Sequence, residues 1–203
     1  MAQRKIIIVP TPSKAEMQSY LDKWELLNNY VKQEKALSKL FHQTYPTNSN
    51  SDEVLVKACT LNAFYSTNIR NIFIVAEHIV NLNIDARLQA GDLSLVNDLT
   101  TVPNFPARVY SFATKYCSHH KPNNFPIYDS YVEKVLLHFQ KLDRFGDFGK
   151  ECLRNYAKFF NAVISFQKFY NLQEFSVKEI DRYLWLLGKH HFPKTFWKKK
   201  NNA

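Results

Sequence analysis

Along most of the chain, hydrophobic positions recur at helical spacing, and no stretch alternates as a series of strands would. Proline- and asparagine-rich stretches at 44–51 and 103–106 interrupt the pattern. The first twelve residues form either an edge strand or a packed arm. A helix is expected over about 13–30, followed by a further helical stretch to about 41. The other expected helices are 51–65, 68–81, 93–99, 108–120, 130–141, 151–170 and 176–188. The pattern predicts an all-α protein.

The stretch 108–136 carries the most informative pattern. Apolar side chains fill one face of its first helix, and the opposite face holds Arg108, Ser111, Lys115, Ser118 and His119. The helix should end before Pro122, because the residue before a proline disfavours the α region. After an extended segment, Asp129 and Ser130 supply N-cap chemistry, with Glu133 completing a capping box from Ser130. We therefore expect a lysine on a polar helix face and a carboxylate at a helix N-terminus.

This unit resembles the helix-hairpin-helix DNA glycosylases, most closely over 111–132 and more weakly over 55–80. In that family an aspartate begins one helix, and a lysine on the preceding helix is the nucleophile of the bifunctional members. The resemblance implies Asp129 as the catalytic carboxylate and Lys115 as the nucleophile. An alignment without gaps back from Asp129 places the family's lysine on Ser111, one helical turn before Lys115.

The resemblance also implies a single domain of two helical lobes with a cleft between them, approximately 44–129 and 1–43 plus 130–203. Residues implied to contact DNA or the base are Asn62, Tyr65, Arg108, Ser111 and His119. The family's hairpin usually contains Gly-x-Gly, whereas this chain has proline, asparagine and phenylalanine over 103–107. Phosphate contact would therefore rely on side chains such as Asn104 and Arg108.

Charge points to the same class of partner. The 203 residues include 27 lysines and arginines against 18 acids, a net charge of +9. Such an excess suits DNA, RNA or an anionic membrane surface, although it also serves solubility. The 16 phenylalanines and 11 tyrosines offer both core and surfaces for base stacking.

Cysteine usage and hydropathy narrow the class further. Three scattered cysteines predict neither disulfides nor the iron–sulfur centre that the family often carries, and they favour a reducing cytoplasm. No run reaches the length of a signal sequence or a membrane span. We expect a cytoplasmic monomer without cofactor or metal.

Each candidate also has a purely structural interpretation. Asp129 is an ordinary cap, and Lys115 lies on a solvated face. Phe64 is assigned to the core and Asn68 to a cap. Cys117 and His120 lie on the apolar side, so buried packing is favoured over a metal site. A basic aromatic tail, comprising Lys194, Phe196, Trp197 and Lys198–Lys200, is either a solvated terminus or a phosphate anchor.

The sequence thus predicts a DNA glycosylase that flips and excises a damaged or modified base, with β-elimination following if Lys115 acts. The resemblance allows an oxidised purine in repair or a modified base in invading phage DNA. The alternatives are a non-catalytic helical nucleic-acid-binding protein and a protein-interaction module.

Overall fold

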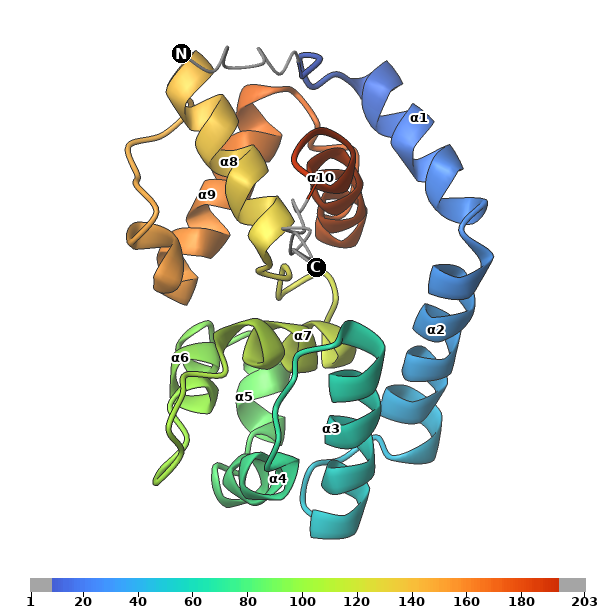
Figure 1. Ribbon diagram of the computed structural model, residues 1–203, viewed down its shortest axis with the longest axis vertical. Coiled ribbons are helices and arrows are strands. Elements are labelled where there is room, and N and C mark those ends of the chain that lie inside the picture. The colour runs from blue at the N-terminus through green and yellow to red at the C-terminus, as the bar shows by residue number, and fades with distance from the viewer. Residues whose placement is uncertain (1–8, 194–203) are drawn as a thin grey trace, which may run out of the picture.

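The computed structural model describes residues 9–193, and every regular element within that range is a helix (Figure 1). The elements are α1 (Lys14–Glu25), α2 (Asn28–Lys39), the π-helix η1 (Leu40–Thr44), α3 (Ser51–Tyr65), α4 (Ile72–Asn81), α5 (Asp85–Ala90), α6 (Ser94–Thr100), α7 (Tyr110–His120), α8 (Ser130–Asp143), the 3-10 helix η2 (Cys152–Arg154), α9 (Tyr156–Phe169) and α10 (Val177–His191). The all-α expectation is confirmed. The basic tail and most of the N-terminal arm lie outside the described residues.

The helices form two groups (Figure 1). Helices α3 to α7 pack together, and α8, α9 and α10 pack together with α1 against α10. Helix α2 runs along one side from the second group to the first, where Phe41 of η1 meets Tyr116 of α7 with ring centroids 5.2 Å apart. The chain therefore joins the first group shortly before residue 44.

Several helix boundaries differ from those that the sequence pattern predicts. A turn at Leu26 and Leu27 separates α1 from α2, which lets α1 pack on α10 while α2 continues toward α3. Gly91, in the left-handed region at φ 67°, ends a helix that the pattern did not predict, α5. Asn155 caps α9 by accepting from the Lys158 N–H at 3.2 Å, so this helix begins later than expected.

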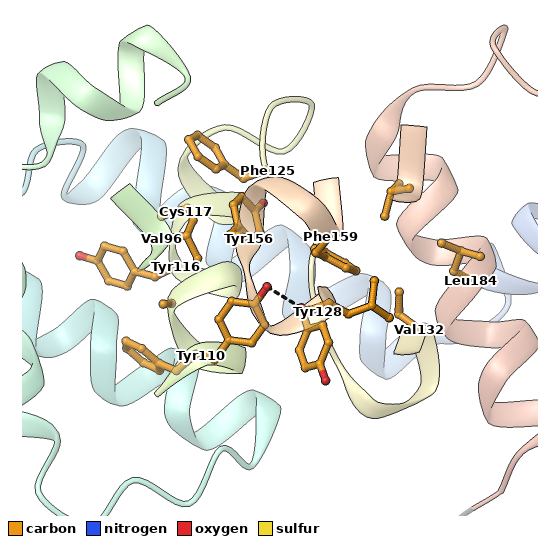
Figure 2. Packing of buried hydrophobic residues seen from close by; sticks show 14 of the residues in the cluster. Val96, Tyr110, Tyr116, Cys117, Phe125, Tyr128, Val132, Tyr156, Phe159 and Leu184 are labelled. Carbon is orange, nitrogen blue, oxygen red and sulfur yellow. Dashed lines mark hydrogen bonds between the residues drawn. The ribbon is translucent and has the colours of Figure 1, made fainter. Parts of the chain in front are cut away.

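Helix α7 lies at the centre of the molecule. All its residues except Ser111 are buried, including those of the face predicted to be polar and solvated. Tyr110 packs against Tyr128 at 4.7 Å between centroids, and Tyr128 packs edge-on against Phe159 of α9 at 5.4 Å (Figure 2). The prediction of a solvated face on this helix is wrong, because helices from both groups cover it.

Capping follows the sequence in part. The Ser176–Glu179 capping box that begins α10 is confirmed. The box from Ser130 to Glu133 is wrong, because Asp129 is the N-cap and the Glu133 carboxylate accepts from the Tyr128 hydroxyl instead. Asn68 does not cap α4, which begins only at Ile72.

Among the described helices, none has the length and apolar character needed to cross a bilayer.

Candidate functional site

A cleft of about 1170 Å³ opens between the two groups of helices. One wall comes from the turn after α3 and from the loop that leads into α7. The other comes from the start of α8 and from α10, with α2 at one end. Lys115, Asp129 and Asp181 all line this cleft, so it collects both main sequence candidates and a carboxylate that the sequence analysis did not select.

The extended segment before α8 is tied to its neighbours through its backbone. The Tyr128 N–H donates to Thr114 Oγ1 of α7 at 3.2 Å, and the Tyr156 hydroxyl of α9 donates to the Pro126 carbonyl at 2.9 Å. These bonds fix the direction in which the chain enters α8. They therefore fix the position of Asp129, the next residue.

Asp129 has the predicted place at a helix N-terminus. Its Oδ1 accepts from the N–H groups of Tyr131 at 2.7 Å and Val132 at 3.0 Å. Two N–H donors and the helix dipole stabilise a negative charge at this point. The side chain is half-buried and lines the cleft, so capping leaves the carboxylate within reach of a bound molecule.

Lys115 is only 4% exposed, and its amine points along the helix toward the preceding turn. Its Nζ donates to Ser111 Oγ at 2.5 Å and to the Ser111 carbonyl at 3.2 Å, and it lies 3.5 Å from the Tyr128 carbonyl. The amine also lies 5.2 Å from the ring centre of Tyr65. Lys115 and Ser111 therefore present one polar group, at the level of Ser111, beside the segment that carries Asp129.

Asp181 of α10 is the residue that sequence reasoning missed. It is 5% exposed, its Oδ2 accepts from the Ile127 N–H at 2.7 Å, and its Oδ1 has no hydrogen-bond partner. Burial raises the pKa of this carboxyl to about 8, the Ile127 N–H and the cations Lys178 and Lys115 oppose the shift, and Asp129 reinforces it. The sequence held a signal for it, because Asp181 shares the buried face of α10 with Leu184 and Gly188.

Two of the residues predicted to contact DNA, His119 and Asn62, lie behind the cleft surface. The Tyr65 ring lines the cleft, and its hydroxyl pairs with His119 Nε2 at 2.9 Å, whereas His119 itself does not line it. Burial lowers the pKa of His119 well below its usual value, so the ring is neutral. Asn62 also stays off the cleft, where its amide bonds Thr67 and both the N–H and the carbonyl of Ile69. These two side chains support the cleft wall.

The turn after α3 and the loop before α7 form the opposite wall. Phe64 is 37% exposed and lines the cleft, so its assignment to the core is wrong. Asn68 and Asn104 both have φ 57°, the left-handed region that asparagine tolerates better than most residues. Asn104 therefore makes the turn where the resembling family has glycine. Arg108 follows it as an exposed cleft residue.

Cationic side chains outnumber acidic ones around the cleft. The cations that line it are Arg70, Arg108, Lys115, Lys134, Lys150, Arg154, Lys178 and Arg182, and the acids are Glu34, Asp129, Glu133 and Asp181. Some of the charge is paired, since Glu34 bonds both Lys178 at 3.0 Å and Arg182 at 2.9 Å. The balance still favours an anionic ligand.

Aromatic rings gather at the α10 end of the cleft. Trp185 packs edge-on against Tyr30 at 5.1 Å and against Trp24 at 6.0 Å. The Arg182 guanidinium lies 5.2 Å from the centre of the Trp24 ring. Flat rings beside cations are suited to stacking against a nucleobase next to its phosphate.

Cys117 and His120 have structural roles. Cys117 is fully buried, and His120 Nε2 pairs with Asn48 Oδ1 at 3.1 Å. Within residues 9–193, no three side chains of the metal-binding types come together in a way that could hold an ion.

Comparison with known proteins gives two matches. The HI_0787_N family model, described as an N-terminal domain, matches residues 16–124, which is more than half of the chain. An uncharacterized protein of Haemophilus influenzae is 52% identical over 137 residues, which are 66% of this chain and 65% of that relative. The match thus covers slightly less than two thirds of the relative's length. No solved structure matches. The family match includes Lys115 and ends before Asp129 and Asp181, and on its extent the chain belongs to the HI_0787_N family.

Proposed function

We propose that this protein is a DNA N-glycosylase that takes a modified base into the cleft and cleaves its bond to the sugar. The observation that carries the proposal is the position of one amine. Lys115 Nζ lies 3.5 Å from the carbonyl of Tyr128, and Asp129 is the next residue. The amine and the carboxylate thus both line the cleft beside the same backbone segment.

The reach of the lysine side chain determines where its amine lies along α7. Side chains on a helix lean toward its N-terminus, so the end of a lysine stem lies about one turn before its Cα. The bonds from Lys115 Nζ to Ser111 place the amine at the level of Ser111. An alignment without gaps places the family's lysine at Ser111, and by the same rule the amine of a lysine there would lie about one turn nearer the start of α7. The offset of four residues therefore keeps the amine on the same face of the helix and changes its depth.

The chemistry follows from the two groups. The Lys115 amine gives up a proton to the Asp129 carboxylate and attacks C1′ of the sugar, the bond from C1′ to the base breaks, and the base leaves with its electron pair. The Asp129 carboxylate stabilises the positive charge that develops on the sugar and accepts the proton lost by the lysine nitrogen. Opening of the sugar ring then gives a Schiff base, from which β-elimination cleaves the strand.

The walls of the cleft supply the binding that this reaction requires. An extruded nucleotide carries a flat base and flanking phosphates. The Tyr65 ring and the two tryptophans offer stacking faces, and Arg70 and Arg108, which also line the cleft, can contact phosphate. A non-catalytic nucleic-acid-binding protein would have the same charge, so the covalent step must separate the two functions.

The test is reduction with borohydride in the presence of duplex DNA that carries an abasic site. The wild-type protein should form a covalent adduct, and Lys115→Gln should form none while its DNA affinity stays within a few-fold of wild type. Lys134→Gln is the matched control, because Lys134 also lines the cleft but donates to the Phe192 carbonyl at 3.3 Å. Tight binding without any adduct would favour the non-catalytic alternative.

A further inference from the structure

The proposed reaction leaves one buried group of the cleft unused, the carboxyl of Asp181. This side chain reaches the segment before Asp129 from α10, the opposite side to Lys115. One of its oxygens is occupied by the Ile127 N–H at 2.7 Å, and the other is buried without any partner. A lone buried oxygen is costly, and a carboxylate in that position is costlier still.

We infer that Asp181 is the proton donor to the departing base. This inference rests on the proposed function and adds a residue to it. As the bond between C1′ and the base nitrogen breaks, that bond's electron pair goes to the base, and the base takes the proton from Asp181 Oδ1. Asp181 is left as a carboxylate, and Asp129 carries the proton that it received from the nucleophile. Exchange with solvent then restores both groups.

Two carboxyl groups in one cleft need different environments if one is to accept a proton and the other is to donate one. Asp129 caps a helix and accepts from two backbone N–H groups, so its oxygens are placed to act as acceptors. Asp181 accepts from one N–H and is otherwise enclosed, which favours its neutral form and raises its pKa to about 8. Such divergence is how paired carboxyls divide the acid and base roles.

Charged and titratable groups from every neighbouring element act on Asp181. They are Lys178 on its own helix, Lys115 on α7, Asp129 before α8, Tyr65 on α3 and Tyr156 on α9. Arg182, the next residue of α10, is paired with Glu34 of α2. Lys178 and Lys115 lower the pKa of Asp181, Asp129 raises it, and burial is the largest influence. Glu34 is paired with Lys178, which partly offsets the effect of that cation.

Asp181→Asn tests the inference, since asparagine can still accept from the Ile127 N–H but cannot release a proton. The probes are duplexes that carry 8-oxoguanine, hypoxanthine or uracil, all neutral bases, and a duplex with an abasic site. On any base that the wild type releases, the variant should slow single-turnover release by about 10²-fold. It should leave borohydride trapping on the abasic duplex within about two-fold, because no base departs there.

The pH profile adds a readout that a structural role would not change. Wild-type release should decline as pH rises through the pKa of Asp181, about 8, and the variant should lack that decline. Lys178→Gln gives a second test that keeps Asp181 itself. Removal of this cation should move the wild-type decline to higher pH, since Lys178 lowers the pKa of Asp181.

Three outcomes would contradict the proposals, and each contradicts a different part of them. Normal base release by Asp181→Asn with an unchanged pH profile overturns the proton-donor role alone. Equal loss of release and of trapping in a folded variant makes Asp181 a positioning residue for the Asp129 segment and overturns the inference. A wild-type protein that neither releases a base nor traps overturns the proposed function, and the inference with it.

Discussion

At the N-terminus of α8, one carboxylate caps the helix and has a proposed role in catalysis, and substitution can separate the two. Asp129 Oδ1 holds the first turn of the helix through two backbone N–H groups. A capping role requires only a short side-chain acceptor, and asparagine meets that need about as well as aspartate. The proposed chemistry also requires the negative charge.

Asp129→Asn should therefore be more stable than Asp129→Ala, whereas both variants should lose activity. The asparagine variant keeps the cap and should lose at most about 1 kcal/mol, from its weaker interaction with the helix dipole. The alanine variant loses the cap, at a cost of about 0.5–2 kcal/mol. Both should lose base release by a factor of order 10² or more. Thermal unfolding and single-turnover release measure the two effects, and an active asparagine variant would make Asp129 a cap only.

Single residues also show what could be read from the sequence and what could not. The cap at Asp129 and the box at Ser176 were predictable, because capping uses neighbours within three positions. The engagement of Asn62 with its own turn and the exposure of Phe64 depend on how α3 ends, at Ser66 in the left-handed region. The buried state of Lys115 depends on residues distant in the chain that cover α7.

Among the elements, the pair α8 and α10 does most to set the shape of the site. The two helices pack closely at Gly188, where an added Cβ would lie 2.7 Å from both Cβ and the carbonyl oxygen of Tyr131. Tyr131 donates one of the N–H groups that Asp129 accepts. The absence of a side chain at Gly188 therefore allows the helix that carries Asp181 to approach the start of the helix that Asp129 caps.

Gly188→Ala tests that close approach. Alanine favours a helix interior over glycine by roughly 1 kcal/mol, which alone would stabilise the protein. The clash with the Tyr131 backbone should outweigh this gain and leave a net loss of about 1–3 kcal/mol. Chemical unfolding measures the difference. Gly149→Ala is the control, since a Cβ there meets nothing within 4 Å, and a stabilised Gly188→Ala would contradict the packing.

The element boundaries show where pattern reasoning reaches its limit. Helical spacing was enough to predict α3, α4, α8 and α10 within a few residues. It placed the break between α1 and α2 near residue 30, whereas the chain turns at Leu26 and Leu27, where the two helices diverge toward different partners. The helix α5 was missed, because six residues are too few for a periodic pattern to appear.

For the whole molecule, composition favours a polyanionic partner, and the fold places part of the charge around the cleft. The excess of nine positive charges says nothing about location. Eight cations line the cleft that separates the two groups of helices. That arrangement depends on residues from Arg70 to Arg182 coming together, which the sequence alone could not give.

If phosphates are the main partner, affinity for duplex DNA should fall steeply with salt. Contact with four to six phosphates gives a slope of roughly −4 to −5 in a plot of log affinity against log salt. Arg108→Gln should reduce that slope by about 1, and Lys168→Gln, an exposed residue of α9 away from the cleft, should not change it. Titrations at several salt concentrations measure the slopes, and a flat plot would exclude phosphates as the main partner.

The proposed reaction requires the amine of Lys115 to attack the sugar beside Asp129. The most direct measurement is peptide mass mapping of the protein after borohydride reduction with an abasic duplex. We predict that the added mass lies on the peptide that contains Lys115, and on its side chain when that peptide is fragmented. An adduct on Lys134, Lys178 or the N-terminal amine, or the absence of any adduct, would contradict the claim.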